Sequence, residues 1–159
     1  MREAVFNILR SEVEGAKVAD FFAGTGAMGL EALSRGAESA LFVEKSFGAA
    51  KLIEQNIELL GYGEKAELIK GDVFTVSRKL VSSGLKFDII FLDPPYEGDE
   101  CGRLFDSDFI AELLAEGGVA ALEAPSKSKI VRAPKNLKIT DRREWGKCGY
   151  LFLELVDSK

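Results

Sequence analysis

The 159-residue sequence contains no histidine and only two cysteines, Cys101 and Cys148. Without histidine, the chain cannot form Ser-His-Asp or Cys-His catalytic systems, a histidine general base or most kinds of zinc site. The two cysteines show neither a CxxC pair nor metal-ligand spacing, which suits a reducing cytosol. We therefore expect no metal, and any chemistry must depend on carboxylates, lysines, backbone groups or a cofactor.

The sequence also lacks long apolar runs. Its longest, residues 18–23 and 87–92, are far shorter than the roughly 20 residues of a membrane-spanning helix. It opens without the charged and apolar segments of an export signal. We expect a cytoplasmic protein with no membrane partner, and the length and 47% apolar content suit one compact domain, expected to be a monomer.

Strand-like and helix-like patterns alternate along most of the chain. Helices are predicted over residues 2–13, 27–35, 47–60, 73–81 and 105–115, and strands over residues 17–22, 39–43, 66–70, 87–92 and 118–123. Two further strands, residues 137–144 and 150–156, are joined closely enough to form a hairpin. This order predicts an α/β fold with a doubly wound, mostly parallel, seven-stranded Rossmann-like sheet and a C-terminal antiparallel hairpin.

A glycine-rich turn follows the first strand, where sheets of this kind bind ligands beyond their carboxyl ends. Gly24, Gly26 and Gly29 allow a tight turn and a close approach of the backbone to a ligand. A dinucleotide site and a purely structural turn remain open as alternatives. The candidate cofactor-binding residues of this segment are Asp20, Phe22, Ala23, Gly24, Thr25 and Gly26.

Acidic residues follow the next two strands. Glu44, 18 residues beyond Gly26 and followed by Lys45, could accept hydrogen bonds from both hydroxyls of a ribose, or it could be a surface glutamate. Asp72 could accept a hydrogen bond from an adenine amino group, with Val73 beside the ring. N-capping of a helix by Asp72 is a competing role, and the two roles are compatible.

The segment Asp93-Pro94-Pro95-Tyr96 follows the fourth strand. The two prolines stiffen the loop and donate no backbone hydrogen bonds, so its carbonyls stay available as acceptors. The Asp93 carboxylate and the Pro94 carbonyl could both face an exocyclic amine, and Tyr96 offers a ring for base stacking. We take these four residues as candidate catalytic residues and Asp93 also as a cofactor-binding candidate.

These motifs, in this order, resemble class I methyltransferases that act on planar amines. Residues 2–9 (Arg-Glu-Ala-Val-Phe-Asn-Ile-Leu) and 20–26 (Asp-Phe-Phe-Ala-Gly-Thr-Gly) more closely resemble the RsmD-like 16S ribosomal RNA guanine-N2 methyltransferases. The resemblance covers almost the whole chain. It implies one methyltransferase domain over residues 1–159, with an N-terminal helix in residues 1–14 and the hairpin in residues 136–156.

The resemblance implies S-adenosylmethionine as the cofactor and ribosomal RNA or the small ribosomal subunit as the partner. Gly24 and Gly26 would hold the methionine part, Glu44 the ribose and Asp72 the adenine. Asp93 and the Pro94 carbonyl would orient a guanine amine, with the base against Tyr96. The family usually carries a short basic segment before the Arg-Glu-Ala helix, whereas this sequence begins at Met1.

The charge pattern does not decide whether the substrate is a nucleic acid. A net charge of −5 argues against nucleic acid, but residues 126–147 hold eight Lys and Arg residues against two acidic ones, an excess of six positive charges. A solvated surface is the alternative interpretation of that segment. Other hypotheses are a methyltransferase for DNA adenine or protein glutamine, a nicotinamide-dependent oxidoreductase and a non-catalytic RNA-binding factor.

Overall fold

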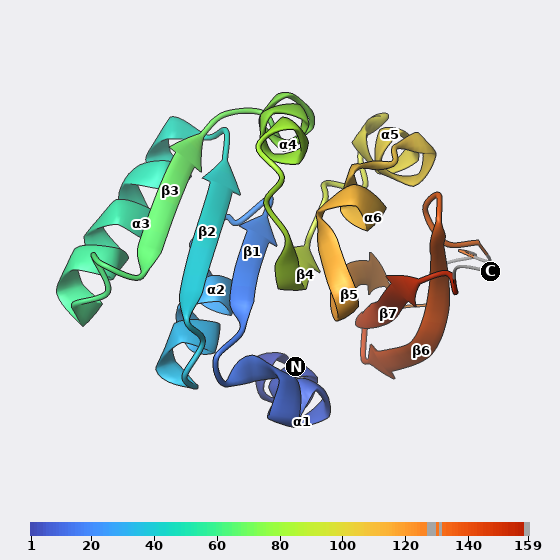
Figure 1. Cartoon of the computed structure of the whole chain (residues 1–159), viewed down its shortest axis with the longest axis horizontal. Helices are drawn as coiled ribbons and strands as arrows, with labels where there is room; N and C mark the ends of the chain where they lie inside the picture. The colour runs from blue at the N-terminus through green and yellow to red at the C-terminus, as the bar shows by residue number, and fades with distance from the viewer. Residues whose placement is uncertain (127–129, 131, 158–159) are drawn as a thin grey trace.

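The computed structural model describes residues 1–126, 130 and 132–157, and it shows the expected α/β fold (Figure 1). The helices are α1 (Arg2–Val13), α2 (Ala27–Ser34), α3 (Phe47–Leu60), α4 (Val73–Ser82), α5 (Glu100–Asp106) and α6 (Phe109–Leu113). The strands are β1 (Lys17–Phe21), β2 (Ser39–Glu44), β3 (Ala66–Lys70), β4 (Phe87–Leu92), β5 (Leu114–Pro125), β6 (Leu137–Trp145) and β7 (Cys148–Leu155).

In the described part of the chain, seven strands form one sheet in the order β3-β2-β1-β4-β5-β7-β6. Strands β1 to β5 are parallel, and β7 pairs antiparallel with both β5 and β6. The chain moves outward from β1 to β3 and then returns to β4 on the other side of β1. The boundary between β1 and β4 is therefore the topological switch point, where doubly wound sheets bind ligands. The predicted fold class is confirmed.

Helices cover both faces of the sheet (Figure 1), and β4 shows how one strand serves two cores. Ile89 and Phe91 pack in the cluster that includes the buried residues of α1 and α2. Ile90 and Leu92 pack in the other cluster, with α4, α5 and α6. Since alternate residues of a strand face opposite sides, the continuous apolar run of β4 follows from burial on both faces.

The single helix predicted over residues 105–115 is wrong. Helix α5 ends at Asp106 and α6 begins at Phe109, with Ser107 in an extended conformation between them (φ −96°, ψ 156°). The Ser107 hydroxyl donates a hydrogen bond to the Leu104 carbonyl at 2.8 Å, a local bond that competes with helix continuation. Leu114 then pairs with Phe87, so β5 starts four residues earlier than predicted. The helical spacing of the apolar residues fits one helix or two, so it could not reveal the break.

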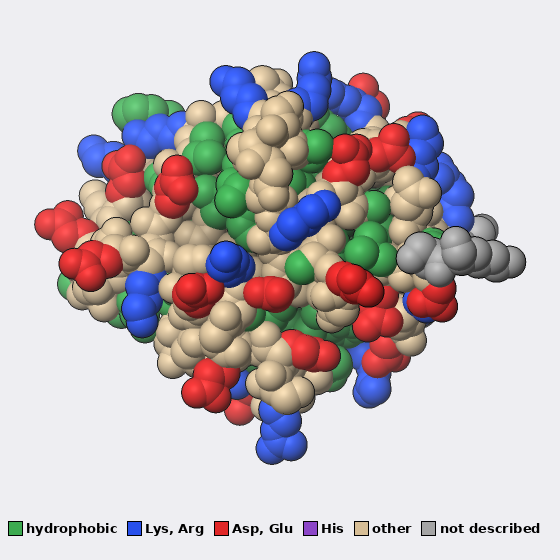
Figure 2. Space-filling model, viewed as in Figure 1, with side chains coloured by type: hydrophobic (Ala, Val, Ile, Leu, Met, Phe, Trp, Pro, Cys, Tyr) green, Lys and Arg blue, Asp and Glu red, His purple; other side chains and the backbone are tan. Residues whose placement is uncertain are grey.

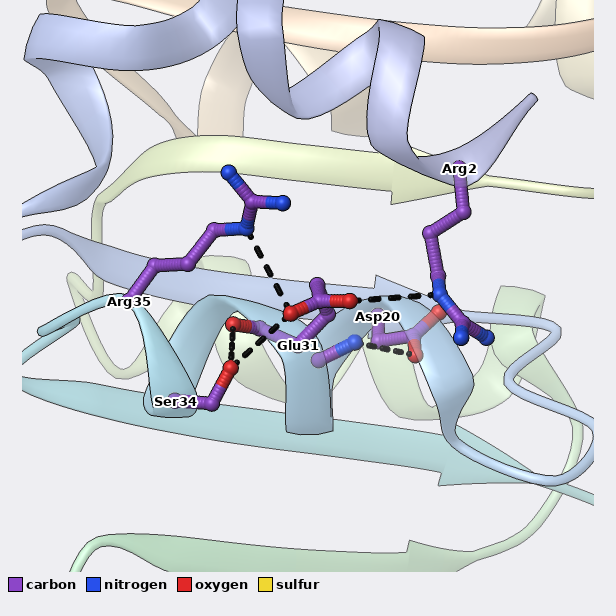
Figure 3. A network of polar contacts seen from close by, with 6 residues as sticks. Arg2, Asp20, Glu31, Ser34 and Arg35 are labelled. Atoms are coloured by element: carbon purple, nitrogen blue, oxygen red, sulfur yellow. Dashed lines mark hydrogen bonds and ion pairs between the residues drawn. The ribbon is translucent and has the colours of Figure 1, made fainter.

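Helix α1 packs through an apolar face. Val5, Phe6, Leu9 and Val13 are buried, and the Phe6 ring lies 5.5 Å from that of Phe91. Figure 3 shows the polar contacts at its first turn. Glu31 of α2 pairs with Arg2 of α1 and with Arg35, each at 3.4 Å. Such exposed ion pairs contribute little, so the apolar face is the main attachment of α1.

The predicted hairpin is present as β6 and β7. Its register pairs Cys148 at the start of β7 with Pro125 at the end of β5. The hairpin turn therefore lies at the edge where the parallel strands end.

In the basic segment of residues 126–147, Lys127 and Lys129 lie outside the described residues. Across the ranges that the structure describes, no helix has the length and apolar character to span a membrane.

Candidate functional site

The turn after β1 is built around Asp20 and three glycines. Gly24 and Gly26 have φ angles of 59° and 80°, which favour glycine. Asp20 is 4% exposed, and its Oδ2 accepts a hydrogen bond from the Gly29 backbone nitrogen at 3.0 Å (Figure 3). A side chain at Gly29 would collide with the Phe42 ring, which lies 2.3 Å from an ideal Cβ position. The sequence at this turn thus fixes how β1 passes into α2.

Glu44, at the end of β2, uses both carboxylate oxygens to hold the backbone. Oε1 accepts a hydrogen bond from the Gly24 nitrogen at 2.8 Å, and Oε2 accepts one from the Ser46 nitrogen at 2.8 Å. Each oxygen has a second acceptor site, so a ribose can still bond to this carboxylate. Glu44 therefore lies at the glycine turn, as the sequence predicts, and also has a structural role there.

Asp72 caps α4. Its Oδ2 accepts hydrogen bonds from the Thr75 nitrogen at 3.0 Å and from the Thr75 hydroxyl at 3.2 Å. The capping role considered from the sequence is therefore present. The cofactor contact of Asp72 stays a prediction, compatible with the cap because Oδ1 is a second acceptor.

The segment after β4 is tied to β5. Pro94 is buried, whereas Asp93 and Pro95 are exposed. The half-buried Tyr96 donates a hydrogen bond from its hydroxyl to the Glu123 carbonyl oxygen at the end of β5. The hydroxyl end of the Tyr96 ring is thus held by β5.

A pocket of about 300 Å³ lies among the carboxyl ends of β1, β2, β3 and β4. Of the candidate residues, those that line it are Phe22, Glu44, Lys45, Asp72, Val73, Asp93, Pro94 and Pro95. Those that do not line it are Asp20, Ala23, Gly24, Thr25, Gly26 and Tyr96. Asp20 and Gly24 interact with the lining residues without lining the pocket: the Asp93 carboxylate helps to raise the pKa of Asp20, and the Gly24 nitrogen donates to Glu44.

Three lining residues, Val43, Gly71 and Glu100, were not among the candidate site residues predicted from the sequence. The first two adjoin predicted residues on the same strand ends and could have been included. Glu100 is different, because it belongs to α5. It forms an ion pair with Lys45, with the Lys45 Nζ 2.8 Å from Oε1, which raises the pKa of Lys45. No local pattern marks a contact between residues 55 positions apart.

Carboxyl groups dominate the electrostatics. Burial raises the pKa of Asp20 from 3.8 to about 8; the Gly29 hydrogen bond opposes this rise, and the carboxylates of Asp93 and Glu44 add to it. Although Asp93 as a whole is exposed, its carboxyl is partly withdrawn from water, and this together with the nearby carboxyl of Glu123 raises the pKa of Asp93 from 3.8 to about 6. Carboxyls in such proximity resist ionising together, so the pocket favours a positively charged ligand.

This arrangement argues against a dinucleotide. A pyrophosphate at this turn would need free backbone N–H groups at the start of α2. The nitrogens of Gly24 and Gly29 instead donate to the carboxyl groups of Glu44 and Asp20, so they are not free to bind a phosphate. A sulfonium compound with an ammonium group and an adenosine fits the same donor and acceptor set: carboxylates for the positive charges, acceptors at Glu44 and Asp72 for the hydroxyls and amine, and Phe22 and Val73 for the ring.

Known proteins resemble this chain in sequence and in structure. The family described as Conserved hypothetical protein 95 matches residues 1–154. Ribosomal RNA small subunit methyltransferase D of Escherichia coli (strain K12) is 28% identical over 153 residues, covering 94% of this chain and 74% of that protein. The structure of yhhF from Escherichia coli has a TM-score of 0.84 at 25% identity, covering 99% of this chain and 86% of that one. A SAM-dependent methyltransferase from Agrobacterium tumefaciens has a TM-score of 0.66 at 25% identity, covering 80% of this chain and 44% of that one.

The switch-point pocket, its acidic lining and these structural likenesses define the class: an S-adenosylmethionine-dependent methyltransferase fold, with S-adenosylmethionine as cofactor. Within that class, the chain belongs to the Conserved hypothetical protein 95 family. The family resemblance stated from residues 2–9 and 20–26 is confirmed.

Proposed function

We propose that this protein transfers a methyl group to the exocyclic N2 amine of a guanine in small-subunit ribosomal RNA. The observation that carries the proposal is the position of Asp93-Pro94-Pro95 in the lining of the switch-point pocket. There a carboxylate and a backbone carbonyl can both accept hydrogen bonds from one amine beside the cofactor. The ribosomal RNA named for the relative from Escherichia coli supports the choice of polymer.

Residues at the ends of β1, β2 and β3 would hold the cofactor, which supplies an electrophilic methyl group on a positively charged sulfur. The backbone around Gly24 and Gly26 would take the methionine part. Glu44 would accept from the ribose hydroxyls through the lone pairs that Gly24 and Ser46 leave free. Asp72 would accept from the adenine amine while it keeps the cap of α4.

The segment after β4 would orient the target amine. Asp93 has a pKa of about 6, so the ionised form predominates at neutral pH and can accept from an N–H group. The carboxylate and the Pro94 carbonyl would aim the nitrogen lone pair and stabilise the positive charge that develops on it. Tyr96, held through its hydroxyl by the Glu123 carbonyl, would present its ring to an unpaired or flipped guanine.

Basic side chains near the same edge would contact the RNA backbone. Arg143 and Lys147 are exposed beside the hairpin turn, next to the end of β5. Arg78 on α4 and Arg103 on α5 are also exposed. Figure 2 shows Lys and Arg side chains along the upper rim of the molecule, the side toward which β1, β2 and β3 point in Figure 1. This distribution supports a phosphate-binding rim around an acidic pocket.

We further propose that residues 1–159 act as one methyltransferase domain. Helix α1 contributes to the core that contains β1 and β4, and the hairpin extends the same sheet. A ribosomal RNA substrate would place this domain in the cytoplasm, and neither the reaction nor the pocket needs a second copy of the chain.

The test is transfer of radiolabelled methyl from S-adenosylmethionine to unmethylated small-subunit ribosomal RNA, followed by nucleoside analysis. Bare RNA and RNA bound by ribosomal proteins serve as parallel substrates. We expect label in N2-methylguanosine from at least one of them. Label in methyladenosine, label in DNA or in protein glutamine, or no label with either RNA despite cofactor binding would contradict the proposal.

A further inference from the structure

Glu123 lies beside the site but has no place in the motifs of the sequence. It follows Leu122 in β5, and Leu122 pairs with Leu92 of the parallel strand β4. The next residues of the two strands are Glu123 and Asp93, so the two carboxyl groups leave neighbouring strand ends side by side. Asp93 lines the pocket, and Glu123 lies behind it on the side of the hairpin.

Glu123 is held from two further elements. The buried Tyr150 of β7, its partner in the antiparallel register, donates a hydrogen bond from its hydroxyl to Glu123 Oε2 at 3.3 Å. The Tyr96 hydroxyl donates to the Glu123 backbone carbonyl. One glutamate thus connects β5, β7 and the loop that carries the proposed catalytic segment.

The Glu123 carboxyl lies close enough to that of Asp93 to act on it: burial and then the neighbouring Glu123 carboxyl raise the pKa of Asp93. Two carboxyls this close can bond to each other only when one of them carries a proton. Asp20 of β1 also lies near, because Asp93 adds to the rise of its pKa. The other charged residues in the lining of the pocket are Glu44, Lys45, Asp72 and Glu100, and Lys45 forms an ion pair with Glu100.

We propose that Glu123 is a positioning residue of this site: its carboxyl, held by Tyr150, lies against that of Asp93, keeps it directed into the pocket and opposes the loss of its proton. The role in catalysis rests on the proposed function, whereas the interaction of the two carboxyls does not. Ionised Asp93 is a full acceptor for the target amine, so turnover should rise with pH as Asp93 ionises.

The substitution Glu123→Gln separates charge from position. The glutamine amide keeps the shape of the side chain and can donate to the Asp93 carboxylate at every pH. It removes the neighbouring negative charge that opposes ionisation of Asp93. Glu116→Gln is the matched control, because Glu116 lies in the same strand, exposed, near its opposite end.

The first measurement is a carbon-13 NMR titration of the Asp93 carboxyl in the full chain. We expect the titration midpoint to fall by about one pH unit or more in Glu123→Gln, and to stay at the wild-type value in Glu116→Gln. An unchanged midpoint in Glu123→Gln, with the melting temperature retained, would overturn the interaction of the two carboxyls and with it the proposal.

The second measurement is the pH profile of kcat at saturating cofactor. We expect the acidic limb of Glu123→Gln to move to lower pH, while Glu123→Ala loses kcat roughly tenfold with little change in cofactor Kd. Tyr150→Phe, which removes only the hydroxyl, should show a smaller loss of kcat. Wild-type kcat and pH profiles in both Glu123 variants would overturn the positioning role. A wild-type protein that methylates no ribosomal RNA would contradict the proposed function alone. The NMR titration tests the interaction between Asp93 and Glu123 without requiring turnover.

Discussion

The Oε1 atom of Glu44 accepts a hydrogen bond from the backbone nitrogen of Gly24 at 2.8 Å, so the end of β2 is tied directly to the glycine turn after β1. A carboxylate in this position both shapes the turn and presents its remaining lone pairs to the pocket. The cofactor site therefore depends on contacts within the protein as much as on contacts to the ligand.

This bond predicts the behaviour of Glu44 variants. Glu44→Ala should raise the Kd for S-adenosylmethionine by about tenfold or more, because charge-assisted hydrogen bonds of 1.5–3 kcal/mol are lost. Glu44→Gln keeps an acceptor for Gly24 and should lose less. Isothermal titration calorimetry measures both, with exposed Glu67→Ala on β3 as the control. A Kd in Glu44→Ala equal to that of the control would show that Glu44 does not contribute to cofactor binding.

Asp93 should matter for turnover rather than for cofactor binding. Asp93→Ala removes the acceptor for the target amine, so we expect kcat to fall roughly a hundredfold while the Kd for S-adenosylmethionine changes little. Asp99→Ala is the matched control, because Asp99 lies in the same loop and its side chain does not cap α5. Equal losses of cofactor binding and of turnover in Asp93→Ala would argue that Asp93 serves mainly to hold the cofactor.

Asp20 predicts how stability depends on pH. Its pKa rises from 3.8 to about 8 in the folded protein, so the folded state holds a proton that the unfolded state has lost. The free energy of unfolding should therefore fall as pH rises between these two values. Asp20→Asn cannot ionise and keeps an oxygen for the Gly29 nitrogen, so it should be more stable than wild type by about 1 kcal/mol or more at pH 8. Urea denaturation at pH 5 and pH 8 tests this, and a stability difference of the same size at both pH values would refute it.

Gly29 should tolerate no side chain. An added Cβ would lie 2.3 Å from the Phe42 ring, which is fully buried, so Gly29→Ala should cost about 1–3 kcal/mol through overpacking. Gly48→Ala, in α3, has nothing within 4 Å of the new Cβ and should be neutral or stabilising by up to about 1 kcal/mol. Thermal unfolding of the two variants gives the comparison. Equal stability would mean that Phe42 can move aside.

The hairpin turn should contribute to RNA affinity through charge. Reversal of Arg143 and Lys147 to glutamate should weaken RNA binding and reduce its dependence on salt, because fewer phosphate contacts release counterions. Lys65→Glu, exposed just before β3 at the opposite edge of the sheet, carries the same kind of charge change. Filter binding at several salt concentrations distinguishes them. An unchanged salt dependence in the hairpin variant would place the RNA on another surface.

The sequence by itself determined most of the fold. Glycine spacing after β1, the double-faced apolar run of β4 and the alternation of strand and helix patterns are local signals, and each indicated the correct element. The break at Ser107 was not predictable in this way, because one helix and two short ones bury the same apolar spacing. The end of the second helix is set by the pairing of Leu114 with Phe87, a contact between distant parts of the chain.

The same division holds for the site. Residues directly after strands, such as Glu44, Asp72 and Asp93, could be predicted because parallel strands bring their carboxyl ends to one edge. Their partners could not be predicted. Glu100 beside Lys45 and Glu123 beside Asp93 come from other elements, at sequence separations that no local pattern spans. Sequence determined which side chains reach the edge of the sheet. Tertiary structure alone decided which carboxyls lie close enough to change one another's ionisation, because Coulomb energy and desolvation depend on distance and burial in space rather than on position along the chain.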